Sequence, residues 1–304
     1  MLAESSVAAR PRLGALFILI AGSLWATTGT SASFLPANVS PLATGAASFI
    51  VGSLLLFVTS ISSSVLVLRT PAHRIRLGVA ALAVAVFPLA FYSSMNLAGV
   101  AVGTVVTVGS APIFATVLEI VFYRRRPRIL WMAASASAVA GVLLLAFSGI
   151  ASGAEGRSVA QLAEAPFGIL LGLIAGFAYA YYTFESRRLI TDGQPSRGVF
   201  GAMFLVAAIA LLPVLLAMGA PLFQSGLTIG IVGYLAAGPM FAAYLFFGVG
   251  LRSTSSSTAT TLTLIEPFVA TILAIVVVGE RLASLGWAGL VLILVGVTVM
   301  VIGG

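Results

Sequence analysis

Two stretches of the sequence, Ser-Ala-Pro-Ile-Phe-Ala-Thr at residues 110–116 and Ile-Glu-Pro-Phe-Val-Ala-Thr at residues 265–271, decide how the rest of the chain is interpreted. They lie 155 positions apart (265 minus 110), and each places a proline and then an aromatic or apolar run inside a long hydrophobic segment. The same offset relates Gly141-Val142 to Gly296-Val297. Matches at one fixed spacing indicate an internal repeat.

The composition excludes an ordinary water-soluble protein. Hydrophobic residues make up 60% of the 304 residues, charged residues 8%, and the mean hydropathy is +1.17. Soluble domains carry about 25% charged residues, so this chain has too little charge to coat a surface in water. Apolar runs of about 20 residues, which cross about 30 Å of hydrocarbon as a helix, recur along the whole sequence. The sequence therefore predicts an all-α membrane protein.

Charges, prolines and polar clusters divide the chain into ten apolar segments, each long enough for one transmembrane helix. The ten segments are residues 13–32, 42–68, 77–97, 103–123, 128–149, 166–186, 197–218, 226–250, 256–278 and 284–302. No soluble domain fits in the remaining residues.

The repeat divides these ten helices into two sets of five. We predict a tail at 1–12, a first repeat at 13–149, a non-cytoplasmic linker at 150–165 and a second repeat at 166–304. Because five is odd, the second repeat enters the membrane upside down relative to the first. Inverted repeats are typical of secondary transporters, whose substrate lies near the membrane midplane between the halves.

The arginines indicate the orientation, because cytoplasmic loops carry an excess of positive charge. All basic residues are arginine, and with the N-terminus inside, thirteen of the fifteen face the cytoplasm. These are Arg10, Arg12, Arg69, Arg74, Arg76, Arg124, Arg125, Arg126, Arg128, Arg187, Arg188, Arg197 and Arg252. Only Arg157 and Arg281 fall on the other side. We expect a multi-pass protein of the cytoplasmic (inner) membrane with both termini in the cytoplasm.

The inventory of reactive residues argues against an enzyme. The chain has no Lys, no Cys and a single His, His73, in an arginine-rich loop. These absences exclude a phosphate-loop Lys, a Schiff base, a Cys nucleophile and thiolate metal sites. The carboxylates are scattered singly, which disfavours a metal site. We therefore expect no catalytic residue, metal or cofactor. We also expect no nucleic-acid partner, because the arginines flank apolar spans. The protein is expected to be a monomer or a weak dimer.

Two carboxylates lie inside predicted spans, where an ionisable group costs about 2.5 to 3.5 kcal/mol and is a functional candidate by default. Glu266 directly precedes Pro267 near the middle of its helix, a position suited to binding a substrate ammonium or a proton. Glu119 lies near the cytoplasmic end of its helix, and a structural pairing with an arginine is favoured there. Both remain candidates for proton coupling. Glu185 and Glu280 end their helices beside arginines, which predicts ion pairs.

Aromatic and polar side chains supply the other candidates for substrate binding, because ligand pockets combine aromatic walls with a few polar groups. Trp25 and Tyr179 occupy equivalent positions of the two repeats at an offset of 154 (179 minus 25). The full predicted set is Trp25, Thr28, Tyr92, Asn96, Tyr179, Tyr182, Tyr244 and Glu266. Each residue of this set has an ordinary alternative role as an interfacial anchor or a packing residue.

The sequence resembles the EamA-type group of the drug/metabolite transporter superfamily. The resemblance rests on the proline-centred runs at 110–116 and 265–271, on Gly279-Glu280-Arg281-Leu282, and on a glycine-rich last helix that ends with Gly296-Val297. It implies a ten-helix inner-membrane carrier that exports amino acids, other small metabolites or drugs. The first half departs from the pattern, because Arg124 and Arg125 stand where the second half has Gly279 and Glu280.

From these observations we expect a secondary transporter that exports a small organic metabolite, such as an amino acid, by alternating access. Two alternatives stay open: an efflux carrier for lipophilic cationic drugs, and a membrane scaffold without transport activity. Coupling to protons and uniport also both remain open. The expected partners are the small-molecule substrate and the lipid bilayer.

Overall fold

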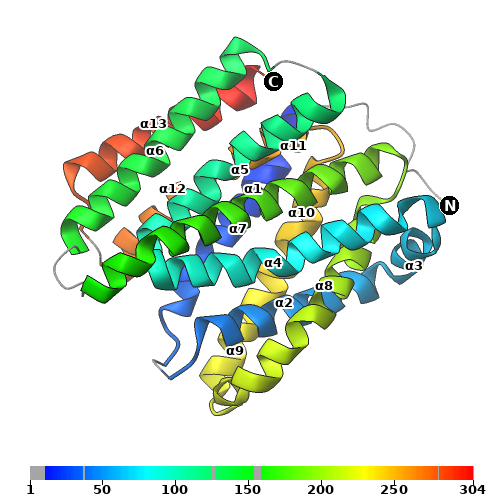
Figure 1. Cartoon of the computed structure of the whole chain (residues 1–304), viewed down its shortest axis with the longest axis horizontal. Coiled ribbons are helices and arrows are strands. Elements are labelled where there is room, and N and C mark those ends of the chain that lie inside the picture. The colour runs from blue at the N-terminus through cyan, green and yellow to red at the C-terminus, as the bar shows by residue number, and fades with distance from the viewer. Residues whose placement is uncertain (1–10, 37, 125–126, 154–158, 280, 304) are drawn as a thin grey trace.

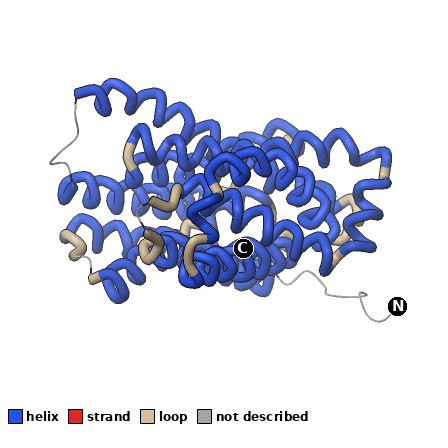
Figure 2. The backbone as a smooth tube through the Cα atoms, turned by 90° about the horizontal axis from the view of Figure 1, so that it is seen from below, coloured by secondary structure: helices blue, strands red, loops and turns tan. Residues whose placement is uncertain are grey.

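The computed structural model describes residues 11–36, 38–124, 127–153, 159–279 and 281–303. These residues form helices joined by loops, and they contain no strand (Figure 2). Ten helical segments in the described ranges are long and apolar enough to cross a membrane. The predicted all-α membrane class and the predicted number of spans are therefore confirmed.

The first half contains five spans, and Figure 1 shows how they are arranged. Its helices are α1 (Pro11–Ala32), α2 (Pro41–Thr59), α3 (Ile61–Arg69), α4 (Arg74–Ala98), α5 (Val100–Tyr123) and α6 (Ile129–Gly153), with a short 3₁₀ turn at Pro71–His73. The sequence predicted one helix over 42–68, but the structure divides it at Ser60. The Ser60 hydroxyl donates a hydrogen bond to the Leu56 carbonyl at 2.6 Å. Such a side-chain bond offers the backbone an alternative to a continuous helix.

The second half also contains five spans, and two of them are interrupted. Its helices are α7 (Val159–Thr191), α8 (Ser196–Met218), α9 (Gly226–Leu235), α10 (Ala243–Gly250), α11 (Ser256–Leu262), α12 (Ile265–Leu273) and α13 (Ser284–Gly303), with a 3₁₀ turn at Ala220–Phe223 and π-helical turns at Ala236–Ala242 and Ala274–Val278. Helices α6 and α7 both extend into the stretch assigned to the linker at 150–165.

The eighth and ninth spans were predicted to be continuous, and the structure corrects this. In the eighth span the π-helical turn contains Pro239, which has no backbone N–H to donate. In the ninth span, Thr263 and Leu264 separate α11 from α12 just before Glu266 and Pro267. Widened turns and helix breaks of this kind occur often at functional sites.

Two helix pairs bring together residues that are 155 positions apart. Between α6 and α13, the Ser137 hydroxyl donates to the carbonyl of Leu292 at 2.9 Å. Between α2 and α8, the rings of Phe49 and Phe204 (204 minus 49 is 155) stack with centroids 5.0 Å apart. A residue that contacts its own counterpart lies on the axis of a two-fold arrangement.

The paired helices α6 and α13, which lie side by side in Figure 1, run antiparallel. Gly141 packs against the backbone of Gly289, and Gly296 packs against the backbone of Ala134. As residue numbers rise along α6 they therefore fall along α13. The two contacts are also reciprocal. Gly289 is the repeat counterpart of Ala134 and Gly296 is that of Gly141, each 155 positions later in the sequence, so the offset converts one contact into the other. Glycine is required at such positions because a Cβ atom would collide with the facing backbone.

Candidate functional site

Aromatic rings from both halves meet in the interior of the bundle. Trp25 of α1 lies against Tyr179 of α7, edge to face with ring centroids 6.5 Å apart, and against Tyr244 of α10 at 5.0 Å. Tyr182 is 5.4 Å from Tyr179, so one turn of α7 presents both rings to the same centre. The structure thus brings together four of the predicted aromatic residues.

Hydrogen bonds hold the polar ends of these rings in place. The hydroxyls of Tyr182 and Tyr244 lie 3.0 Å apart, and the Tyr179 hydroxyl lies 2.9 Å from that of Thr263 at the break in the ninth span. The Trp25 indole N–H donates to the Pro239 carbonyl in the π-helical turn of the eighth span, at 2.8 Å. The π-helical turn of the eighth span and the break in the ninth span are therefore both tied to the aromatic cluster.

Glu266 adds a carboxylate to this cluster. It is the second residue of α12, directly after the helix break, and it is half-buried. Within the described residues its side chain has no hydrogen bond and no ion pair. Its carboxylate is within electrostatic range of four tyrosine hydroxyls, those of Tyr92, Tyr179, Tyr182 and Tyr244. An uncompensated carboxylate among aromatic faces is suited to attract a cation.

The other three predicted residues lie at the edge of the cluster or beyond it. The Tyr92 ring packs on Gly45 of α2 and lies 5.5 Å from the ring of Phe91. Asn96 is exposed near the end of α4, and Thr28 is half-buried in α1. Neither of these two side chains forms a hydrogen bond within the described ranges. Their role in binding stays a prediction.

The structure adds residues that sequence reasoning missed. Phe247 is 5.2 Å from Trp25, Phe204 is 4.4 Å from Tyr244, and Phe87 is 5.7 Å from Tyr179, measured between ring centroids. Thr263 could have been found as the polar residue one helical turn before Glu266. The phenylalanines carry no comparable signal, because apolar aromatics are frequent throughout the chain.

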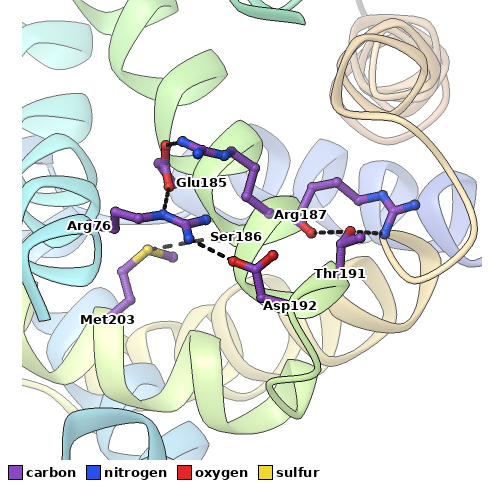
Figure 3. A network of polar contacts seen from close by, with 8 residues as sticks. Arg76, Glu185, Ser186, Arg187, Thr191, Asp192 and Met203 are labelled. Atoms are coloured by element: carbon purple, nitrogen blue, oxygen red, sulfur yellow. Dashed lines mark hydrogen bonds and ion pairs between the residues drawn. The ribbon is translucent and has the colours of Figure 1, made fainter. Parts of the chain in front are cut away.

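A charged network joins the two halves on the arginine-rich side (Figure 3). Arg76 of α4 binds Glu185 of α7 at 2.8 Å and Asp192 at 2.6 Å, and Glu185 also binds Arg188 at 2.6 Å. The predicted ion pair of Glu185 with an adjacent arginine is confirmed for Arg188, whereas Arg187 donates to the Thr191 hydroxyl. The prediction missed Arg76, because the two partners lie 109 positions apart in sequence. Glu280 lies outside the described residues.

Glu119 corrects another prediction. Its carboxylate accepts hydrogen bonds from the hydroxyls of Ser256 and Ser257, both at 2.6 Å, and from the Ser257 backbone N–H at 3.0 Å. No arginine of the described ranges lies within ion-pair distance of it. The physical reason is that the first N–H groups of α11 lack partners within the helix and attract a carboxylate. Glu119 thereby ties α5 in the first half to α11 in the second.

The ninth span is buried more deeply toward its arginine-rich end than toward its other end. In the ninth span, every residue over 256–265 is buried except Thr258, whereas every residue over 266–275 is half-buried. On the opposite side, two exposed polar contacts connect the halves: Thr27 with Tyr234 at 2.7 Å, and Asn38 with Gln224 at 3.4 Å. Glu266 lies at the transition between the two regions.

Ten membrane-crossing helices with a carboxylate among aromatic rings in the interior define an integral membrane protein of the transporter class. The chain belongs to the EamA-like transporter family, whose profile matches residues 12–147 and, a second time, residues 166–302. This confirms the resemblance seen in the sequence and shows that the protein is a membrane transporter of this family.

Two relatives and one solved structure are similar to this chain. An uncharacterized transporter of Bacillus subtilis (strain 168), YwfM, is 33% identical over 285 residues, which cover 94% of this chain and 92% of the relative. An uncharacterized transporter of Clostridium kluyveri is 33% identical over 135 residues, 42% of each chain. One crystal structure superposes with a TM-score of 0.75 at 21% identity, over 94% of this chain and 95% of that one, and supports the fold alone.

Proposed function

We propose that the protein exports a small organic metabolite that carries an ammonium group, such as an amino acid, and binds it at Glu266. The main support for this proposal is the half-buried Glu266 carboxylate, which has no hydrogen-bond or ion-pair partner within the described residues. This carboxylate interacts electrostatically with four tyrosines. A bound ammonium compensates the carboxylate, and the surrounding rings add cation–π attraction of about 0.5 to 2 kcal/mol. The outward direction follows from the family resemblance.

Alternating access between two inverted halves is the proposed mechanism. The antiparallel contact of the repeat-equivalent helices α6 and α13 supports inversion, because a two-fold axis along the membrane normal would make equivalent helices parallel. The Glu119 and Arg76 contacts join the two halves on the arginine-rich side in this state. We propose that they break when the site opens toward that side. The interrupted eighth and ninth spans supply places where helices bend.

We place proton coupling, if the transporter uses it, at Glu266 and not at Glu119. Both oxygens of Glu119 already accept hydrogen bonds from serines, whereas those of Glu266 are free to exchange a proton for a substrate ammonium. A proton gradient imposed across proteoliposomes then drives uptake by the wild-type protein. Equal rates with and without the gradient indicate a uniporter.

A second function, efflux of lipophilic cationic drugs, is favoured by one observation: Glu266 interacts electrostatically with tyrosines that belong to an interior cluster of aromatic rings. Rings attract a planar cation as readily as a primary ammonium. Radiolabelled amino acids and planar cations, tested as one panel in liposomes with the purified protein, separate the two functions. Movement of no panel member would favour the scaffold alternative.

The decisive variant is Glu266→Gln, which keeps size and hydrogen bonding and removes the charge. We expect it to lower transport at least about tenfold, because a charge-assisted contact contributes about 1.5 to 3 kcal/mol. Glu164→Gln, which makes the same change at an exposed site at the start of the sixth span, is the matched control and retains activity. Transport by Glu266→Gln at the control rate would refute the proposed site.

We further propose that the arginine-rich side faces the cytoplasm and that the protein resides in the inner membrane. The support is that arginine-bearing connections converge on one side, where Arg76 reaches Asp192 and where Arg128 and Arg187 line one cavity. Single cysteines introduced at residues 74 and 252 of this cysteine-free chain report the orientation by accessibility labelling. Labelling from the periplasm would overturn it.

A further inference from the structure

A cavity of about 610 Å³ opens at the arginine-rich end, apart from the aromatic cluster. Its wall comes from both halves: the ends of α5, α7 and α13, the start of α6, and the segment 253–258. The volume falls within the range of sites that bind small organic molecules, about 300 to 1,000 Å³. None of the residues predicted to bind substrate lines it, although the coupling candidate Glu119 does.

The cavity contains a cation without a carboxylate partner. Arg187 donates one hydrogen bond to the Thr191 hydroxyl, at 2.6 Å, and within the described ranges no acidic group lies at ion-pair distance. Figure 3 shows its guanidinium directed away from the network in which Arg76 and Arg188 bind Glu185. Arg187 is half-buried and lines the cavity.

The other polar groups of the wall also favour an anion. Arg128 adds a second positive charge, and Glu119, the acidic residue of this wall, is hydrogen-bonded by Ser256 and Ser257, so the three charged residues of this wall leave it with one net positive charge. Trp131 lines the same wall, and its buried indole N–H has no partner within the described residues. In the 253–258 segment, the Thr258 hydroxyl accepts a hydrogen bond from Ser255 and retains its own proton as a donor.

Another part of the lining is apolar. Ile120, Leu130, Val299 and Met300 form this part of the wall. A ligand that matches both surfaces has one negatively charged head and an apolar body, because a fully hydrated anion would leave the apolar wall unused and a neutral hydrocarbon would leave Arg187 unpaired.

We propose that this cavity binds an amphiphilic anion, with a carboxylate or phosphate head on Arg187 and its apolar body along Ile120 and Val299. The proposal goes beyond the transport function, because the ligand has the opposite charge to the group that Glu266 attracts. Two sources offer this chemistry: a free organic anion, and the headgroup of an anionic lipid in the adjacent leaflet. The shared feature is the charged head that Arg187 contacts.

Binding of decyl phosphate to the purified full-length protein tests the proposal. The protein is placed in phosphatidylcholine nanodiscs, and titration calorimetry measures the affinity. We expect saturable binding by the wild type and an affinity at least about tenfold lower in Arg187→Gln, because a hydrogen bond to a charged group contributes about 1.5 to 3 kcal/mol. Arg197→Gln, an equal charge change at an exposed position, is the matched control and keeps the wild-type affinity.

A second variant, Val299→Phe, leaves every charge in place and fills part of the cavity. It lowers the affinity if the ligand occupies this volume, and it keeps the proposal testable should Arg187→Gln fail to fold. Decanol, which lacks the charge, binds wild type and Arg187→Gln equally weakly.

Nanodiscs that contain phosphatidylglycerol distinguish the two sources. If the lipid headgroup occupies the site, decyl phosphate binds more weakly in these nanodiscs, and Arg187→Gln abolishes the difference between the two lipid compositions. If a free anion is the ligand, its affinity is the same in both. Absence of saturable binding in phosphatidylcholine, or equal affinities of wild type, Arg187→Gln and Val299→Phe, would overturn the proposal.

Discussion

The fourth and ninth spans descend from the same repeat sequence, yet one is continuous and the other is broken. Helix α5 runs from Val100 to Tyr123 through Pro112, whereas the equivalent span is divided into α11 and α12 just before Pro267. The local response to the proline is the same in both. Thr116 donates to the Pro112 carbonyl at 2.6 Å, and Thr271 donates to the Pro267 carbonyl at 2.7 Å.

The difference lies in the residues that precede the proline. Subtracting 155 from Thr263 and Glu266 leads to Val108 and Ala111, and Ala111 is fully buried. The polar residues of the ninth span bond to a neighbouring tyrosine or face accessible space, whereas their apolar counterparts pack. The proline by itself therefore does not break the helix, and the two spans differ at the positions of Thr263 and Glu266, which are apolar in the fourth span.

The largest effect is expected from Glu266→Ala, which replaces Glu266 of the ninth span by alanine, the residue at the equivalent position 111 of the fourth span. Transport falls at least about tenfold, because the charged contact to the substrate is lost. The protein becomes more stable to unfolding, because a carboxylate inside a membrane helix costs about 2.5 to 3.5 kcal/mol. Liposome transport and thermal unfolding in detergent measure the two changes. A variant that is both inactive and less stable would mean that Glu266 is a structural residue.

The reverse substitution, Ala111→Glu, places a carboxylate in the fourth span. Ala111 has no exposed surface, so the new group finds no water and must be accommodated against the packing. We expect a loss of stability of about 2.5 to 3.5 kcal/mol and poor yield of folded protein. Unfolding measured against an Ala111→Val control, which adds volume without charge, checks this. Wild-type stability of Ala111→Glu would contradict the contrast between the two spans.

A smaller effect is expected from Thr263→Val, which copies Val108 into the ninth span. The substitution removes the hydroxyl that lies 2.9 Å from the Tyr179 hydroxyl and leaves a buried tyrosine group unpaired, at a cost of about 1 to 3 kcal/mol. A double-mutant cycle with Tyr179→Phe isolates the pair, because the two losses then overlap. Strictly additive losses would show that the hydroxyls do not interact.

The smallest effect concerns the threonines that follow each proline. Thr116→Val and Thr271→Val each remove one hydrogen bond to a proline carbonyl, and intramembrane hydrogen bonds average about 0.6 kcal/mol. We expect equal, small losses of stability in both variants, measured by thermal unfolding side by side. A clear difference between the two would indicate that the local geometry around Pro112 and Pro267 is not shared.

The number of membrane-spanning helices and the internal repeat could be predicted from the sequence, because both depend on local and periodic properties. Apolar length predicts a span without knowledge of its neighbours, and the offset of 155 positions survives in Pro112 and Pro267. It also identified Glu266, since a carboxylate within an apolar run is unusual by itself. The break at Thr263 was not predicted, because a proline pattern alone does not distinguish a continuous helix from an interrupted one.

Partners distant in sequence were decided by the tertiary structure alone. Glu119 was expected to bind a nearby arginine, but its partners are serines 137 and 138 positions away, because the start of α11 offers unpaired N–H groups only once the two halves pack together. The same holds for Arg76 with Glu185, and for Arg187, which the packing leaves without a carboxylate. Composition and periodicity thus determine which segments cross the membrane, whereas the chemistry of each site depends on which side chains the packed helices bring within bonding distance.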